Sequence, residues 1–193
     1  MLISTRSTTV LLSLTLLLQG CAAFVVGGAA TTAMVAHDRR TAGVMVEDQS
    51  IELKTYDRLA KEPEIKEYAN IHVTSYNRVL LLTGQAGTEA IRQKAEQLAT
   101  QVEQVRRVVN EIEIGSVASL GEDTRDLALT SEVKLRLTKV KLEDFDPLRV
   151  KVVTERGVVF LMGLLTKQEA DAVTEEVRHI SGVRRVVKVF EYI

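Results

Sequence analysis

The chain has 193 residues, of which 46% are hydrophobic and 26% are charged, and its formal net charge is −1. This length allows one or two small domains of ordinary globular composition. The near-zero charge argues against a protein that binds nucleic acid by neutralising phosphates, so no nucleic-acid partner is expected. With 4% aromatic residues and no tryptophan, the cores must be mainly aliphatic.

The N-terminus has the pattern of a bacterial lipoprotein signal. Arg6 precedes an apolar run at residues 10–18 that has the length of a signal-peptide core and is too short for a permanent membrane helix. The letters LQGC then end at Cys21, the only cysteine of the chain. We expect residues 1–20 to be removed and Cys21 to carry acyl chains, which hold a protein on a membrane. A secreted protein with a chance cysteine, or an uncleaved anchor, is the alternative.

The segment after the cysteine predicts a flexible tether and a cellular location. Residues 22–36 are small and apolar and show no clean helical or strand period. Together with the residues up to 47 they would span about 30 Å as a loose coil, so residues 21–47 are predicted to be the lipidated tether. The alternative is that Phe24 and its neighbours enter the bilayer. Ala22 replaces the aspartate that retains lipoproteins in the inner membrane of enteric bacteria, so the outer membrane is the expected location.

The letters VRRVV occur twice, at residues 105–109 and 183–187. A strand-ending glycine lies upstream of each copy, Gly84 and Gly163. The glycines are 79 positions apart (163 − 84) and the arginine pairs 78 (184 − 106), so one single-residue gap relates the two halves. An internal repeat of one folding unit explains this better than two unrelated strands of similar composition. The predicted domains are residues 48–115 and residues 116–193.

The first copy has the pattern of two helices and three strands. Asp48 or Ser50 is placed to cap the first helix, and the continuous apolar run VLLL is typical of a central strand. Two residues, Asn77 and Arg78, form the tight turn before that run. The predicted elements are a helix at 51–60, strands around 71–73 and 79–82, a helix over 91–102 and a strand at 105–114.

The second copy repeats this order. Its first helix has an apolar stripe for burial, formed by Leu129, Val133, Leu137 and Val140. The predicted elements are a helix at 126–140, strands at 148–154 and 158–164 joined by the turn ERG, a helix over 170–180 and a strand at 184–193. The fold class is therefore α+β, with two tandem α-β-β-α-β domains, each with two helices on a three-stranded mixed sheet.

The strand-ending motifs VLLLTG and VVFLMG, followed by VRRVVN and GVRRVVK, resemble the BON domain. A lipoprotein signal with two such units is similar to the dual-BON outer-membrane lipoproteins. This resemblance implies a protein without enzymatic activity on the periplasmic face of the outer membrane. It also implies binding of anionic phospholipids, such as phosphatidylglycerol and cardiolipin, through the first helix of the second domain, and a role in envelope integrity, including at the division site. The family pattern includes a membrane-inserting tryptophan near Ala128, which this chain lacks.

Within that helix, Leu127 is the sharpest candidate for membrane contact because the stripe at Leu129 and Val133 is already assigned to the core. Packing against the first domain is the alternative for Leu127. Lys134 and Arg136 can meet lipid phosphates, although acidic neighbours oppose them and a solvated helix face is the alternative. The expected lipid-binding residues are Asp126, Leu127, Ala128, Leu129, Glu132, Val133, Lys134 and Arg136.

Other polar residues carry weaker signals. The repeated arginines at 106–107 and 184–185 are a duplicated anion site or, as we favour, exposed charges that protect strand edges. His37, His72 and His179 lie far apart and have no metal-ligand spacing. We therefore expect no enzyme activity, no metal and no cofactor. The rival function is a scaffold that binds an envelope protein or peptidoglycan and touches the membrane only through its acyl anchor.

Overall fold

The computed structural model describes residues 38–116 and 120–193. The predicted signal peptide, Cys21, most of the predicted tether and His37 lie outside the described residues. Residues 38–193 form one compact unit that contains both copies of the repeat.

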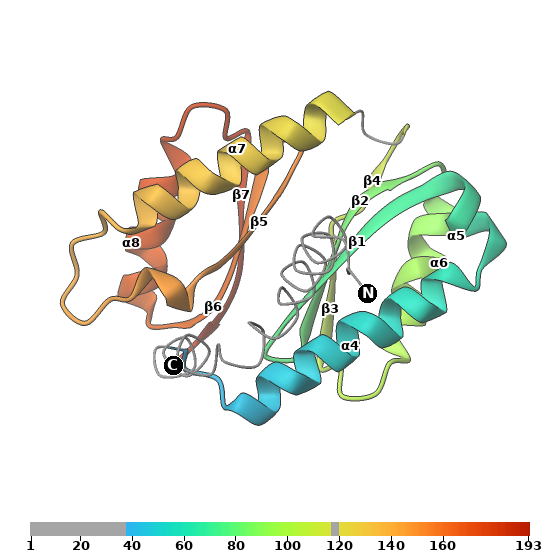
Figure 1. Cartoon of the computed structure of the whole chain (residues 1–193), viewed down its shortest axis with the longest axis horizontal. Helices are drawn as coiled ribbons and strands as arrows, with labels where there is room; N and C mark the ends of the chain where they lie inside the picture. The colour runs from blue at the N-terminus through green and yellow to red at the C-terminus, as the bar shows by residue number, and fades with distance from the viewer. Residues whose placement is uncertain (1–37, 117–119) are drawn as a thin grey trace, which may run out of the picture. The chain divides into compact units, whose positions relative to one another are not determined.

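The first copy folds into a mixed sheet with helices on one face (Figure 1). Its central strand is β2, with β1 antiparallel on one side and β3 and β4 parallel on the other. The predicted third strand, 105–114, is thus present as two pieces that keep one register on β2 and break at residues 111–112. The elements are α4 (Ala42–Ala60), α5 (Pro63–Tyr68), β1 (Ala69–Tyr76), β2 (Val79–Ala86), α6 (Glu89–Thr100), β3 (Arg107–Asn110) and β4 (Glu113–Ile114).

The second copy repeats this topology. The order β5-β6-β7 has one antiparallel and one parallel pair, and α7 and α8 cover one face of the sheet (Figure 1). The predicted α+β fold of two tandem α-β-β-α-β domains is confirmed. The elements are α7 (Leu120–Leu137), the 3-10 turn η2 (Pro147–Arg149), β5 (Lys151–Glu155), β6 (Val158–Leu165), α8 (Lys167–Arg178) and β7 (Arg185–Tyr192).

The start of the first helix differs from the prediction. The N-cap is Thr41, whose hydroxyl accepts a hydrogen bond from the amide of Val44 at 3.3 Å, so α4 begins within the stretch predicted to be a tether. Asp48 and Ser50 are therefore not caps, and Asp48 is buried in the middle of the helix. The capping rule fails because this carboxylate has partners far away in the sequence, which local pattern does not reveal.

Two boundaries in the second copy also differ from the prediction, and the first copy has one additional helix. The first helix of the second copy runs over Leu120–Leu137 rather than 126–140, because the chain turns after Leu137. The strand predicted from residue 148 begins at Lys151, since Asp146 caps a 3-10 turn by accepting from the amide of Leu148 at 2.8 Å. The short helix α5, which starts at Pro63, was not predicted.

Each central strand is buried on both faces. In β2, Leu80 and Leu82 point into the core under the helices of the first domain, while Leu81 points into a different apolar cluster. In β6, Leu161 belongs to the helix-side core and Phe160 to the second cluster. Burial on both faces explains why these strands are continuous apolar runs instead of alternating ones.

That second cluster joins the two domains. It contains residues of the first sheet and of the second, so each domain buries the sheet face that its helices leave open against the other domain. Polar contacts accompany it: the Gln85 amide donates to the Glu155 carboxylate at 2.5 Å, and the Lys151 ammonium to Glu52 at 3.2 Å. The buried members of the cluster are Tyr76, Val79, Leu81, Val158, Phe160, Met162 and Val189.

The repeated arginines make two kinds of contact, one within their own domain and one with the opposite domain. All four are exposed, as expected for charges at strand edges. Arg106 donates to the carbonyl of Asn77 at 2.8 Å, and Arg184 does the same to the carbonyl of Arg156 at 3.0 Å, so each closes the hairpin turn of its own domain. Arg106 and Arg185 also form ion pairs with carboxylates of the opposite domain, Glu191 and Glu111 respectively.

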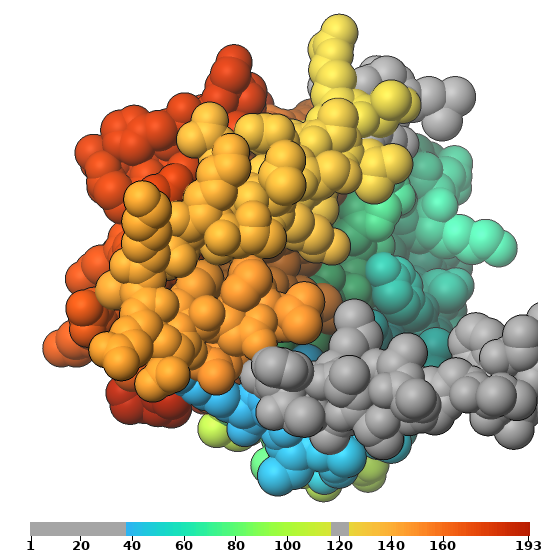
Figure 2. Space-filling view, turned by 60° about the vertical axis from the view of Figure 1, so that its left-hand side comes forward, coloured from blue at the N-terminus to red at the C-terminus, as the bar shows by residue number. Residues whose placement is uncertain are grey.

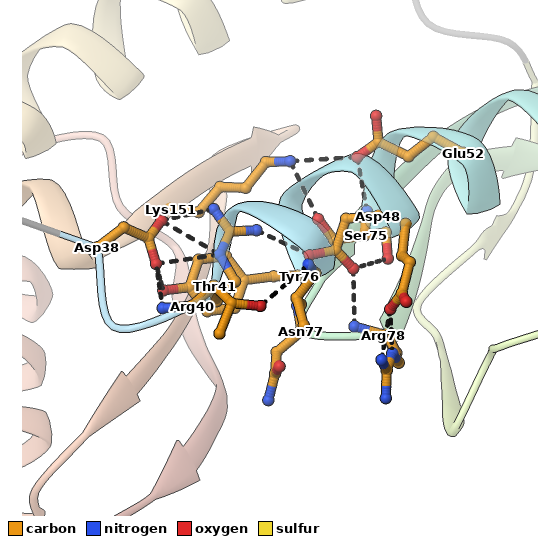
Figure 3. Close-up of polar contacts among 12 residues, drawn as sticks. Asp38, Arg40, Thr41, Asp48, Glu52, Ser75, Tyr76, Asn77, Arg78 and Lys151 are labelled. Carbon is orange, nitrogen blue, oxygen red and sulfur yellow. Dashed lines mark hydrogen bonds and ion pairs between the residues drawn. The ribbon is translucent and has the colours of Figure 1, made fainter. Parts of the chain in front are cut away.

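A short strap before α4 binds both domains. Arg39 forms a bidentate pair with Glu169 of α8 at 2.7 and 2.9 Å. Arg40 pairs with Asp48 at 2.8 Å and lies 3.8 Å from the ring centre of Tyr76 (Figure 3). Burial raises the pKa of Tyr76 to about 12, so this ring stays neutral beside the guanidinium.

The strap predicts a pH dependence of stability. Burial would raise the pKa of Glu169, but hydrogen bonds from Arg39 and Thr166 outweigh it and lower the pKa below its usual range. A lowered folded pKa contributes stability above the unfolded pKa of about 4.3, and this contribution is lost as the pH falls through the folded value. We expect Glu169→Gln to lower the unfolding free energy by about 1–3 kcal/mol at pH 7.

Urea unfolding of both proteins between pH 7 and pH 3 checks this. The difference between them should shrink below pH 4.3 because the wild-type carboxylate becomes protonated. Glu143→Gln, at an exposed position, is the control. A difference that stays constant over the whole pH range would contradict the assignment.

Candidate functional site

The helix α7 has one buried and one exposed face. Leu129, Val133 and Leu137 belong to the core of the second domain, as the apolar spacing predicts. Val140, the fourth member of the predicted stripe, lies beyond the helix and is half-buried. Two of the expected lipid-binding residues, Leu129 and Val133, are therefore core residues that pack the helix onto its domain.

The exposed face of α7 carries large apolar side chains. Leu127 is 69% exposed, which contradicts the alternative that it packs against the first domain. Leu135, which the sequence reasoning did not select, is 56% exposed. The two leucines are eight positions apart, about two helical turns, so they lie on the same side of the helix. One face of α7, yellow to light orange in Figure 2, lies at the surface.

The charged residues of α7 are only partly paired. Lys134 is exposed, and Arg136 pairs with Glu132 one turn earlier at 3.3 Å. Such an exposed pair contributes little to stability, so its arginine is readily available to another anion. Ala128 is exposed and adds little area.

Asp126 supports a turn. Its carboxylate accepts hydrogen bonds from the backbone amides of Arg156 at 2.5 Å and Gly157 at 2.8 Å. These two residues form the β5–β6 turn and both have positive φ, 48° and 74°, as a type I′ hairpin requires. The carboxylate of Asp126, which was expected to contact lipid, therefore hydrogen-bonds to the hairpin turn beside α7.

The first domain contains the same contact. Asp48 of α4 accepts from the amides of Asn77 at 2.8 Å and Arg78 at 2.7 Å, the turn residues between β1 and β2. The internal repeat therefore preserves a bond from the first helix to the hairpin turn. Sequence reasoning missed it because a long-range partner leaves no local pattern.

A pocket of about 580 Å³ lies beside α7, between the β5–β6 turn and the loop before β7. Four of the expected lipid-binding residues line it, and the arginines on its wall come from three different elements of the chain. Its arginines at 125 and 156 were not selected from the sequence, since nothing local indicates that they approach one another. The lining residues are Arg125, Asp126, Ala128, Leu129, Glu132, Arg156, Gly157, Ser181, Gly182 and Arg184.

Two further findings concern chemistry and membrane spanning. Among residues 38–116 and 120–193, no helix is both long enough and apolar enough to cross a membrane. The same part of the chain holds no group of three or more His, Cys, Asp or Glu side chains that could bind a metal ion.

Comparison with known proteins identifies the family. The BON domain model matches residues 47–116 and 125–193. The chain is 38% identical over 187 residues to the outer membrane lipoprotein DolP of Haemophilus influenzae, which covers 95% of this chain and 94% of that protein. It is 38% identical over 159 residues to the 21 kDa hemolysin of Actinobacillus pleuropneumoniae, covering 81% and 79%. It is 31% identical over 151 residues to osmotically-inducible protein Y of Escherichia coli, covering 75% and 72%.

The chain therefore belongs to the BON-domain family and contains two BON domains in tandem. The likeness to DolP over nearly its whole length confirms the prediction of a dual-BON lipoprotein of the outer membrane, associated with that membrane. That relative is named as a lipoprotein and not as an enzyme.

Proposed function

We propose that this lipoprotein is anchored through acyl chains on Cys21 and binds anionic phospholipids, such as phosphatidylglycerol and cardiolipin, through its second BON domain. The exposed face of α7 is the contact surface, and the binding supports outer-membrane integrity, including at the division site. The observation that carries the proposal is the pair of exposed leucines, Leu127 and Leu135, beside Lys134 on one helix.

The energies of these groups favour membrane contact. An apolar side chain that leaves water contributes about 1.5–3 kcal/mol. Each basic residue near an anionic surface adds about 1 kcal/mol. Without a tryptophan the helix offers less apolar area than a large aromatic would provide, so the acyl anchor carries a larger share of the membrane affinity.

The direct test is co-sedimentation of residues 38–193 with liposomes. This fragment lacks Cys21 and keeps the strap at Arg39 and Arg40, which binds both domains. We expect binding to liposomes that contain phosphatidylglycerol or cardiolipin and little binding to zwitterionic liposomes. Equal binding to both, or none, would refute the proposal.

We also predict that Leu127→Glu combined with Leu135→Glu weakens liposome binding at least tenfold. The reason is the loss of about 1.5–3 kcal/mol of apolar burial per leucine together with repulsion from the anionic surface. Leu53→Glu on α4 is the matched control, because that leucine is 71% exposed in the first domain. Circular dichroism checks that each variant is folded. If the α7 variant binds as well as wild type, α7 is not the contact surface.

A second candidate function is a scaffold for an envelope protein. The exposed leucine Leu53 lies seven positions after Val46, which is also exposed, so α4 presents its own apolar stripe on the first domain. A specific protein retained by wild type in a pull-down and lost by Leu53→Glu would support this candidate, above all if the soluble fragment shows no lipid preference.

A further inference from the structure

The pocket beside α7 differs from the corresponding surface of the first domain. The repeat aligns Asp126 with Asp48 and Arg184 with Arg106, a shift of 78 positions in each case (126 − 48 and 184 − 106). The same shift aligns Arg125 with Glu47, Ser181 with Glu103 and Gly182 with Gln104.

In the first domain, carboxylates neutralise the cations of this region. Glu47 pairs with Arg78 of the hairpin turn at 2.5 Å. Glu103 pairs with Lys54 of α4 at 3.2 Å. The surface therefore has no excess positive charge to offer to an anion.

In the second domain both carboxylates are replaced, by Arg125 and Ser181. The remaining acidic residues have other partners, since Asp126 binds the turn amides and Glu132 pairs with Arg136. Among the side chains of residues 38–116 and 124–193, neither Arg125 nor Arg184 has a carboxylate within ion-pair distance. Arg184 is oriented by the carbonyl of Arg156, which carries no net charge.

Two glycines keep the space open. A side chain at Gly157 would begin 2.9 Å from the carbonyl oxygen of Gly182 and 3.2 Å from the side chain of Arg184. The equivalent first-domain residues are the turn residue Arg78, 79 positions before Gly157, and Gln104, and both also have positive φ, 64° and 70°. The first domain thus accepts side chains in this backbone conformation, but in the second domain the Gly182 carbonyl and Arg184 leave no room for one at position 157. A Cβ at Gly182 would meet only Leu129, at 3.9 Å, so glycine there leaves the space beside Leu129 open.

We propose that this pocket binds a phosphate ester group through Arg125 and Arg184, with Arg156 on the same wall. Guanidinium groups match phosphate oxygens in charge and in geometry. The exposed Ala128 and the edge of Leu129 give an apolar surface for the carbons that follow the phosphate, and 580 Å³ is enough for a headgroup. The inference rests in part on the proposed function, since an anionic phospholipid is one source of this group and a soluble phosphate ester is the other.

The test is an NMR titration of residues 38–193. The probes are inorganic phosphate, glycerol 3-phosphate and short-chain dihexanoyl phosphatidylglycerol in monomeric form. We expect concentration-dependent shifts of the Gly157 and Gly182 amides, without matching shifts at the aligned first-domain residues Arg78 and Gln104. The double variant Arg125→Glu with Ser181→Glu, which installs the first-domain residues at exposed positions, should bind at least tenfold more weakly.

The control is Arg107→Glu with Thr100→Glu, which makes the same charge change at exposed positions of the first domain. Equal weakening by both double variants would mean that only net charge matters and would overturn the pocket. Unresponsive pocket amides with all three probes would also overturn it, while liposome binding that depends on Leu127 would leave the proposed function intact. Responsive amides without liposome binding would support the phosphate site, with a soluble ester as its ligand, and refute the proposed function.

Discussion

Replacing Asp48 by alanine should lower the unfolding free energy by about 3–5 kcal/mol, the cost of breaking a buried ion pair from one side. Its carboxylate accepts hydrogen bonds from the Ser75 hydroxyl at 2.7 Å and from the guanidinium of Arg40 at 2.8 Å (Figure 3). It also accepts from two turn amides. Alanine would leave the Ser75 hydroxyl and both turn amides without this acceptor, and Arg40 would keep only its pair with Asp38 at 2.7 Å.

Urea unfolding of residues 38–193 at pH 7 measures this loss. Asp57→Ala is the control, because Asp57 lies on the same helix but pairs with Lys61 at an exposed site. Asp126→Ala should fall between the two, about 1–3 kcal/mol, since that carboxylate binds two amides and is half-buried. If Asp48→Ala costs no more than Asp57→Ala, the buried network does not stabilise the fold as argued.

Phe160→Ala should cost about 3–5 kcal/mol and also disturb the first domain. Phe160 is fully buried in the apolar cluster that joins the two sheets, together with Val79 and Leu81 of β2. Truncating it removes the largest fully buried side chain of that cluster and leaves a cavity between the domains. We therefore expect NMR shifts at the amides of Val79 and Leu81, far from residue 160 in the sequence.

The matched control is Leu161→Ala, one position along the same strand. Leu161 is equally buried but belongs to the core under α7 and α8. It should destabilise the protein by about 2–5 kcal/mol without shifting the first-domain amides. If Phe160→Ala shifts only second-domain amides, the two sheets do not pack together in solution.

Much of the fold was predictable because its signals are local. The spacing of Leu129, Val133 and Leu137 identified the buried stripe of α7, and the two VRRVV copies identified the repeat. Helix ends were predicted less well, since a side chain such as Asp48 can cap a helix or bind a distant turn. Which of these occurs depends on a hairpin that lies about 30 positions further along the chain.

The candidate site was predictable only in part. The resemblance selected α7, and the apolar spacing left Leu127 outside the core, where the structure also has it. The pocket beside α7 could not be predicted, because its arginines come from the helix, the hairpin turn and the loop before β7, and only the fold brings them together.

The sequence by itself predicted the lipoprotein signal and determined the duplicated unit and the pattern of helices and strands. Each of these features depends on residues that are near one another in the chain. Only the tertiary structure decided what covers the second face of each sheet. The apolar runs VLLL and VVFLM require burial on both faces, but helices or another sheet would satisfy that requirement equally. The choice of the other domain's sheet depends on contacts between halves about 80 residues apart, which no local pattern encodes.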